Sequence, residues 1–326
     1  MKTLLKIVGV LLAVVVVVAL GGLGYLMAAF PKVPPASSVK ITATPEMLAR
    51  GQYLNDHVVG CTECHTQRDW TKFTAPNKPE LLGAGGEPFA LDASNTLYSK
   101  NITPAGIGDW TDGEVIRAVT QGVSKDGTPL FPLMPYTHFG AMQEDDVHAV
   151  VAYIRTLKPI ASTVPPRKLG FPLNVIVRTI PGPNTYGKRP PVEDKVACGK
   201  YMTGAALCSD CHTPIDGQGA PLPGMDFAGG MEFTETGYRV RSANITPDSS
   251  TGISSWTEQQ FIDKFKAFEN TTPATMSETE RRQNTVMPMM AYAGTSREDL
   301  SAIFATFAPS SPSPIGSKDS RMRSDV

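Results

Sequence analysis

Two five-residue stretches decide how this sequence is interpreted: Cys61-Thr62-Glu63-Cys64-His65 and Cys208-Ser209-Asp210-Cys211-His212. In both, two thiols three residues apart are followed directly by an imidazole. This Cys-x-x-Cys-His pattern is typical of c-type haem attachment, in which each thiol adds to one vinyl group of the haem. The adjoining histidine is then held under the iron as its proximal ligand. The sequence therefore predicts two covalently bound haem c groups, with these residues as attachment points and ligands: Cys61, Cys64, Cys208, Cys211, His65 and His212.

Two other uses of the cysteines are open alternatives. A Cys-x-x-Cys redox pair is expected in a βαβ context in an intracellular protein. A structural zinc site could use all four thiols, but such sites usually bring their two halves together within a short finger, whereas Cys64 and Cys208 are separated by most of a domain. Neither alternative explains the histidine after both pairs. The fifth cysteine, Cys198, is expected to be a small buried apolar side chain.

Length and composition narrow the class of protein. The 326 residues are enough for two domains of ordinary size with connecting segments. The formal net charge is −1 and no basic block occurs, so no nucleic-acid partner is expected. The 29 glycines and 28 prolines suit a loop-rich fold wrapped around a cofactor.

The N-terminal segment predicts a membrane anchor. Lys2 and Lys6 precede a run from residue 7 to residue 30 that has no charged side chain. A helix of this length crosses a hydrocarbon core of about 30 Å, and the run exceeds the roughly 7–15 apolar residues of a cleavable signal peptide. Ala19-Leu20-Gly21 resembles a cleavage site, but an uncleaved transmembrane helix is expected. The positive-inside rule then keeps the lysines cytoplasmic, which predicts an inner-membrane protein with its haem domains in the periplasm.

An internal duplication extends well beyond the two haem motifs. A Gly-x-Tyr segment precedes each motif, and a glycine-rich loop, an Asn-Ile-Thr-Pro turn and a Trp-Thr pair follow it. Equivalent positions lie 143 to 148 residues apart. The paired segments are 50–54 with 198–202, 84–89 with 228–233, 101–104 with 244–247, and 110–111 with 256–257. Two homologous tandem domains are predicted.

Helix signals occur at matching places in both copies. Thr111 and Thr257 each begin a capping box ahead of an apolar stripe with helical spacing. Helices are also expected over residues 45–58, over residues 144–157, and around residues 300–307. Few segments show the strict alternation of a half-buried strand, so an all-α fold with long irregular loops is predicted.

These signals predict six segments along the chain. They are a signal anchor or transmembrane helix at 1–30, a tether at 31–43, a first domain at 44–158, an interdomain linker at 159–193, a second domain at 194–309 and a disordered tail at 310–326.

The second axial ligand decides what each haem can do. A methionine in this position leaves the iron no open coordination site and raises its reduction potential. Met134-Pro135 and Met287-Pro288 align without a gap through to the last helix of each copy, so Met134 and Met287 are the predicted ligands. Open alternatives are Met142 in the first copy, Met289 and Met290 in the second, and a packing role for either methionine. The remaining histidines, expected to be surface or supporting residues, are His57, His138 and His148.

The ordered motifs resemble class I cytochrome c domains. Over residues 44–157 and 194–309 the chain is similar to the cytochrome c subunits of bacterial membrane-bound alcohol and gluconate dehydrogenases. The resemblance implies two small helical folds, each around one low-spin haem with a partly exposed edge. It also implies that four residues lie near the haem propionates: Asn101, Trp110, Asn244 and Trp256. The chain departs from those subunits in having two motifs rather than three and an N-terminal anchor.

Two closed haems predict an electron carrier without substrate chemistry of its own. Its expected partners are a dehydrogenase, a quinol-oxidising complex or a terminal oxidase, docked through small transient interfaces. The alternative is a dihaem enzyme, peroxidase-like or thiosulfate-oxidising, in which one haem has an open or unusual axial position.

Overall fold

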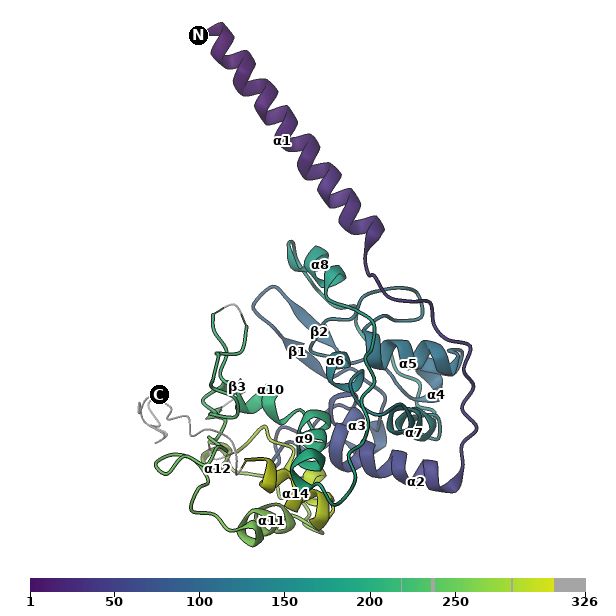
Figure 1. Cartoon of the computed structure of the whole chain (residues 1–326), viewed down its shortest axis with the longest axis vertical. Helices are drawn as coiled ribbons and strands as arrows, with labels where there is room; N and C mark the ends of the chain where they lie inside the picture. Colours follow the sequence, from purple (N-terminus) through teal and green to yellow (C-terminus); the bar gives the residue numbers. More distant parts are fainter. Residues whose placement is uncertain (218, 236–237, 283, 308–326) are drawn as a thin grey trace.

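The first helix stands apart from the rest of the molecule. The computed structural model describes residues 1–217, 219–235, 238–282 and 284–307, and the predicted tail at 310–326 lies outside them. Helix α1 (Lys2–Ala29) projects from the body of the protein (Figure 1), and none of its residues is buried. By length and composition it can cross a membrane. Residues 31–44 join α1 to the body. They are in an extended conformation without helix or strand.

Most of the body consists of two similar runs of helices, here called the first repeat (residues 44–158) and the second repeat (residues 194–307). The first contains α2 (Pro45–Leu54), the π-helical turn η1 (Asn55–Val59), α3 (Cys61–Cys64), η2 (Pro79–Leu81), α4 (Pro104–Ile107), α5 (Asp112–Gln121), α6 (Tyr136–Phe139) and α7 (Glu144–Ile154). The second contains α9 (Lys195–Ala205), α10 (Cys208–His212), α11 (Glu258–Lys266), α12 (Glu278–Arg281), α13 (Met289–Ala293) and α14 (Arg297–Phe307). The helices expected over 45–58 and 144–157 are thus present, with slightly shorter α-helical spans.

In each repeat the first and last helices cross at a glycine. A Cβ atom built on Gly51 of α2 would lie 1.9 Å from the backbone oxygen of Ala149 on α7. The same construction on Gly199 of α9 places it 1.9 Å from the oxygen of Ala302 on α14. Two helix backbones can approach each other this closely only at a residue without a side chain. The shared Gly-x-Tyr segment therefore fixes the same helix crossing in both repeats.

Both expected capping boxes are formed. Thr111 Oγ1 accepts a hydrogen bond from the Glu114 backbone N–H at 3.2 Å, and the Thr111 N–H donates to Glu114 Oε2 at 2.8 Å. The Thr257 and Gln260 pair repeats this arrangement at the start of α11, with distances of 3.2 Å and 2.9 Å. Each box satisfies backbone donors that the first helical turn leaves free.

The chain is helix-rich, but it also contains two short antiparallel hairpins that the sequence pattern did not predict. Strands β1 (Pro88–Ala90) and β2 (Thr96–Tyr98) pair in the first repeat, and β3 (Glu232–Glu235) and β4 (Tyr238–Arg241) pair in the second. Each follows the glycine-rich loop of its repeat. Strands of three or four residues are too short to show the alternation that identifies a strand in sequence.

The two repeats contact each other through equivalent residues. The Tyr53 hydroxyl of α2 donates to Asp299 Oδ2 of α14 at 2.5 Å and accepts from the Ser296 N–H at 3.1 Å. In the reverse direction, the Tyr201 hydroxyl of α9 donates to Asp146 Oδ2 of α7 at 2.6 Å and accepts from the Gln143 N–H at 3.3 Å. Each tyrosine thus binds the start of the other repeat's last helix. One cluster of buried apolar side chains also continues through both repeats.

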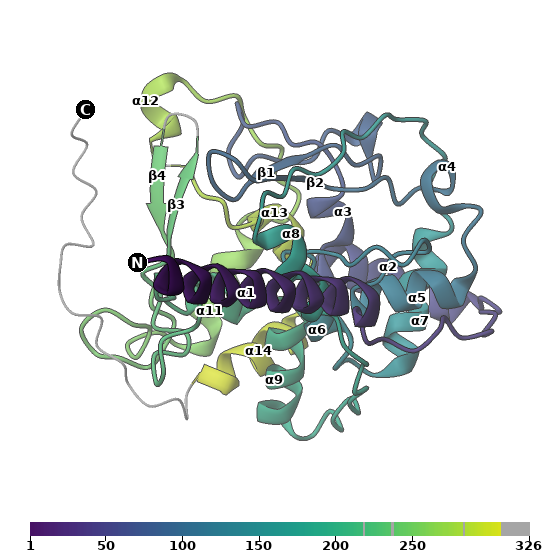
Figure 2. The ribbon, with the colours of Figure 1, turned by 90° about the horizontal axis from the view of Figure 1, so that it is seen from above.

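The segment between the repeats returns to the end of α1. It contains α8 (Leu173–Ile176) and the 3₁₀ turn η3 (Val177–Thr179). Both contact α1, and both ribbon views show α8 beside it (Figures 1 and 2).

Candidate functional site

Each Cys-x-x-Cys-His stretch is held on a short helix that begins after a left-handed residue. Gly60 (φ 61°, ψ 37°) precedes α3, and Leu207 (φ 58°, ψ 29°) precedes α10. This conformation is unusual for leucine and natural for glycine. The same turn is therefore kept in the second repeat despite the less suitable residue, and it ends the preceding helix immediately before the first motif cysteine.

Both motif histidines are oriented by a backbone carbonyl. His65 Nδ1 donates to the Lys100 oxygen at 2.7 Å, and His212 Nδ1 donates to the Ala243 oxygen at 2.8 Å. Because a carbonyl oxygen can only accept, Nε2 is left as the unprotonated nitrogen in both rings. Burial lowers the pKa of both imidazoles, although the carbonyl bond acts in the opposite direction. A metal-bound histidine typically has this neutral state and this second partner.

The glycine-rich loops lock these carbonyls in place. Gly85 has φ +70°, donates its N–H to the His65 oxygen at 2.8 Å, and has room for no Cβ, which would lie 2.5 Å from the Lys100 carbonyl carbon. Gly229 has φ +72°, donates to the His212 oxygen at 2.6 Å, and is equally crowded by Ala243. The duplicated glycines are therefore explained by the positioning of each motif histidine.

The Asn-Ile-Thr-Pro turns have the same internal hydrogen bonds in both repeats. Asn101 Oδ1 accepts from the Thr103 N–H at 2.9 Å and from its hydroxyl at 2.7 Å. Asn244 Oδ1 accepts from Thr246 at the same two distances. These contacts give both asparagines a turn-forming role next to the carbonyl that orients the histidine. The expected proximity to haem propionates stays a prediction.

A cavity of ≈ 330 Å³ lies beside the second motif. It is lined mainly by apolar side chains, together with Cys208, Cys211, His212 and Met287. Met289 also lines it, whereas the lining set does not include Met290. Cavities of this size with an apolar lining and a few convergent polar groups are typical of cofactor sites.

Met134 and Met287 occupy equivalent backbone positions. Each is followed by a proline that begins a short helix, α6 or α13. The Tyr136 N–H donates to the Met134 oxygen at 2.8 Å, and the Met289 N–H donates to the Met287 oxygen at 2.8 Å. Met289 thus corresponds to Tyr136 rather than to a methionine. The rival Met142 of the first repeat is buried at 4 % exposure.

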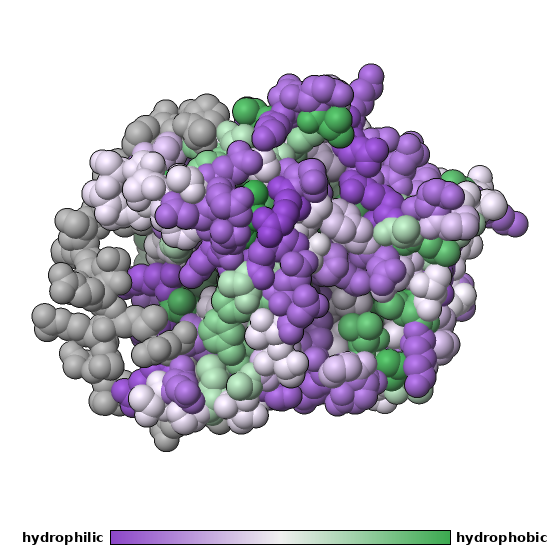
Figure 3. All heavy atoms as spheres, turned by 90° about the horizontal axis from the view of Figure 1, so that it is seen from below, coloured by the Kyte–Doolittle hydropathy of each residue, from purple (hydrophilic) through white to green (hydrophobic). Residues whose placement is uncertain are grey.

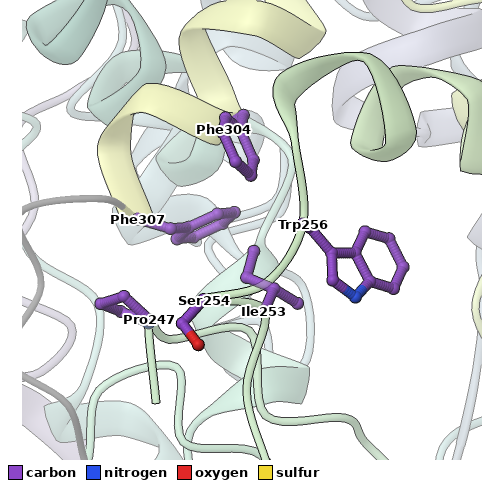
Figure 4. A pocket seen from close by; sticks show the side chains of 6 residues that line it. All are labelled: Pro247, Ile253, Ser254, Trp256, Phe304 and Phe307. Atoms are coloured by element: carbon purple, nitrogen blue, oxygen red, sulfur yellow. The ribbon is translucent and has the colours of Figure 1, made fainter. Parts of the chain in front are cut away.

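Trp256 lies in the wall of the cavity and also borders a smaller pocket of ≈ 230 Å³. Figure 4 shows its indole on the far side of the ribbon from Phe304 and Phe307 of α14. Trp110, at the equivalent position, is half-buried and packs against the apolar core of the first repeat.

The first repeat supplies part of the second cavity. His57 and Val58 of η1 lie in its lining, and His57 Nδ1 donates to the Ala291 oxygen on α13 at 2.9 Å. His138, which follows the Met134 loop, places Nε2 3.0 Å from Asp210 Oδ1 inside the second motif. The two motif regions therefore adjoin. The expectation that His57 and His138 are surface or supporting residues stays a prediction, and no signal in the sequence placed either at this contact.

His148 and Cys198, which were also not predicted as ligands, make their contacts outside both motifs. His148 Nε2 is 3.8 Å from Glu144 Oε1 one helical turn away on α7. Cys198, expected to be buried, is half-exposed, with its thiol 3.2 Å from the Pro191 oxygen. Cys198 corresponds to Arg50 of the first repeat. Its side chain contacts the residues that precede α9 rather than the apolar core.

The donor set fits a covalently attached haem. Each motif combines two thiols with a neutral imidazole whose Nε2 is free, and the second motif borders an apolar cavity that Met287 also lines. Across the residues that the structure describes, no three or more His, Cys, Asp and Glu side chains gather as a metal-ion site, the arrangement that the zinc alternative required.

Comparison with known proteins agrees with this chemistry. No protein-family model matches the chain. It is 30% identical over 240 residues to the cytochrome c subunit of a quinone-dependent alcohol dehydrogenase from Gluconacetobacter polyoxogenes, covering 69% of this chain and 48% of the relative. It is 30% identical over 250 residues to the fructose dehydrogenase cytochrome subunit of Gluconobacter japonicus, covering 71% and 47%.

A third relative is a dihaem c-type cytochrome from Cereibacter sphaeroides, 30% identical over 200 residues, which cover 58% of this chain and 64% of that protein. The chain spans about half the length of the dehydrogenase subunits that it matches. The resemblance expected from the motifs is confirmed: the chain is a homologue of the cytochrome c subunits of bacterial dehydrogenases and of a dihaem c-type cytochrome.

Proposed function

We propose that this protein is a membrane-anchored electron-transfer cytochrome that carries two covalently attached haem c groups. The observation that supports it most directly is the matched orientation of His65 and His212, whose Nδ1 atoms donate to backbone carbonyls and leave both Nε2 atoms free for iron. A chance pair of Cys-x-x-Cys-His sequences would not require the same glycine-supported geometry twice.

In this proposal each repeat forms one cytochrome c domain, at 44–158 and at 194–309. Cys61 and Cys64 hold the first haem, and Cys208 and Cys211 hold the second. The axial pairs are His65 with Met134 and His212 with Met287. A haem with both axial positions filled exchanges single electrons without binding substrate at iron.

The protein residues then have three tasks. The backbone carbonyls keep each imidazole in the tautomer that ligates. The apolar wall of the cavity excludes water around the second site, and a dry, hydrophobic surrounding raises the reduction potential. The contact between η1 and α13 keeps the two sites beside each other, so that an electron received at one is passed on within the molecule.

The same proposal covers location and partners. Helix α1 would anchor the chain in the inner membrane, with both domains in the periplasm. The donor would be a dehydrogenase, as for the relatives, or a quinol-oxidising complex, and the acceptor a respiratory partner such as a terminal oxidase. Carbonate extraction of membranes tests the anchor: the full chain stays with the lipid, and a variant lacking residues 1–30, exported with a cleavable signal, does not.

Haem count and ligation are tested on the full chain. A pyridine haemochrome assay should give two haems per chain. Replacing Met287 by alanine should remove about half of the near-infrared sulfur-to-iron band, while Met290→Ala, the matched control outside the cavity lining, should leave it unchanged. Loss of the band in Met289→Ala instead would assign that residue as the ligand. A wild-type second haem that is high-spin and binds peroxide would contradict electron transfer and support a dihaem enzyme.

A further inference from the structure

The segment between the repeats is fastened to the point where α1 leaves the body of the protein. Arg178 Nη2 donates to the backbone oxygens of Met27 at 3.0 Å and Phe30 at 2.6 Å. These oxygens belong to the last turn of α1 and the residue after it, which have no partner within the helix. The α8–η3 segment therefore sits at the level at which the chain would emerge from a membrane (Figure 1).

This segment exposes large apolar side chains that the protein body does not cover. Phe171 is 79 % exposed, Ile176 is 47 % exposed and Ile180 is 40 % exposed, while Val177 between them is buried at 1 %. Isolated exposed apolar residues are ordinary on soluble surfaces, but a group of them within ten residues marks a contact surface. Because this group of side chains adjoins the apolar helix α1, the two form one continuous apolar surface.

Within the interdomain linker itself, the charges are of one sign. Residues 159–192 contain five basic side chains and no acidic one. Among them, Arg167 and Lys168 precede the exposed group and Arg178 lies within it. Basic residues beside an apolar surface are attracted to the phosphates of anionic lipids by about 1 kcal/mol each. Lys32, three residues after the end of α1, packs over the Phe30 ring at 5.0 Å, and Tyr25 contacts the same ring. Tyrosine side chains such as Tyr25 gather at membrane interfaces.

We propose that residues 170–180, here called the linker segment, lie in the lipid interface beside α1, with Phe171, Ile176 and Ile180 among the acyl chains. This proposal rests on α1 spanning the membrane. A segment placed against the emerging end of a transmembrane helix meets lipid headgroups without any further partner, which favours lipid over protein as the occupant. On the face seen from below, hydrophilic residues are interspersed with scattered apolar patches (Figure 3).

The linker segment is also tied to the first repeat. The Thr96 N–H donates to the Lys168 oxygen at 2.9 Å, the Lys168 N–H donates back at 2.8 Å, and the Gly170 N–H donates to Asn95 Oδ1 at 2.7 Å. Insertion would therefore give the first repeat a second attachment to the bilayer. This second attachment would fix the orientation of the body relative to the bilayer together with the tether, which packs on the first repeat through the Ile41 N–H bond to Asp112 Oδ2 at 2.9 Å.

Photocrosslinking in vesicles tests this directly. The full haem-loaded chain, carrying p-benzoylphenylalanine in place of Phe171, is reconstituted in phosphatidylethanolamine–phosphatidylglycerol vesicles, irradiated and analysed by mass spectrometry. The matched control carries the same group in place of Val192, which lies between the repeats but outside the linker segment, is 81 % exposed, and stands two residues before the second repeat. Carbonate extraction on each sample reports separately whether α1 is inserted.

The expected result is a lipid adduct at position 171, none at position 192, and resistance of both chains to carbonate. Carbonate-resistant chains without a lipid adduct at 171, or with equal adducts at both positions, would overturn the inference while leaving the anchor intact. Release by carbonate would overturn the anchor and the inference together. A protein adduct at 171 in native membranes, without a lipid adduct in vesicles, would assign the surface to a partner subunit.

Discussion

The helix crossing at Gly199 gives a sharp test of how the second repeat is packed. In Gly199→Ala the new methyl would lie 1.9 Å from the Ala302 oxygen and 2.1 Å from Thr306 Oγ1. Favourable carbon contacts need about 3.5–4.0 Å. The atoms that the methyl would clash with include backbone of α14. The two helices α9 and α14 must therefore move apart by more than an ångström.

The expected cost follows from two opposing effects. Overpacking of a closely fitted contact costs about 1–3 kcal/mol, and a clash with backbone belongs at the upper end. Alanine gains about 0.5–1 kcal/mol over glycine within a helix. The net loss in the free energy of unfolding is therefore about 2 kcal/mol. Gly51→Ala, which meets the Ala149 oxygen at 1.9 Å in the first repeat, should lose the same amount.

Gly204 is a matched control on the same helix. A Cβ atom there meets nothing within 4 Å, so Gly204→Ala should be neutral or more stable by up to about 1 kcal/mol. Urea titration of the haem-loaded chain in detergent, followed by far-ultraviolet circular dichroism, gives the midpoints. Equal midpoints for Gly199→Ala and Gly204→Ala would refute the close crossing, because only that crossing distinguishes the two sites.

An inter-repeat hydrogen bond, the ion pair between Arg50 and Asp146 within the first repeat, and the turn beside the first motif histidine give three further predictions. Tyr53→Phe removes the bond to Asp299 and should lower the free energy of unfolding by about 1–2 kcal/mol in urea titration; an unchanged midpoint would argue against the contact. Burial by itself would raise the pKa of Asp146, but the hydrogen bonds from Arg50 and Tyr201 and the charges of Arg50 and Arg189 together outweigh it and hold the pKa below its ordinary value. That stabilisation is present above the unfolded pKa and is lost as the pH falls below about 4. Because Asp146 keeps the Tyr201 hydroxyl and the Arg189 charge, Arg50→Gln should cost about 1.5–3 kcal/mol at neutral pH and make the loss of stability in acid less steep. An unchanged slope in acid would exclude Arg50 as a cause. Gly85→Ala should displace the carbonyl that orients the first motif histidine and reduce haem incorporation in the pyridine haemochrome assay; a full complement of two haems would contradict that role.

The features that the sequence predicted correctly are those encoded over a few residues. The capping boxes at Thr111 and Thr257 form because a hydroxyl and a side chain three residues on can reach each other's backbone. The helices at the ends of each repeat follow from apolar spacing near 3.6 residues. The correspondence of Met134 and Met287 between the two repeats follows from an ungapped alignment, and the backbone hydrogen bonds around both are the same. The axial ligation itself stays a prediction.

Contacts between distant segments were decided only by the tertiary structure. The crossed bonds from Tyr53 to Asp299 and from Tyr201 to Asp146 join residues from different repeats, and no local pattern encodes which surface of one repeat meets the other. The short hairpins form because the glycine-rich loops return the chain onto itself, with too few residues for a period to appear. The position of His57 in the second cavity depends on the same interface.

The Cys-x-x-Cys-His pairs by themselves predict the chemistry, since two thiols and an imidazole at fixed spacing are a local property of the chain. The Lys100 and Ala243 carbonyls that orient those imidazoles lie more than thirty residues away in sequence. They arrive there only when the glycine-rich loop and the following turn pack against the motif helix. The sequence determined which atoms can bind, and folding decided which nitrogen of each histidine is free to do so.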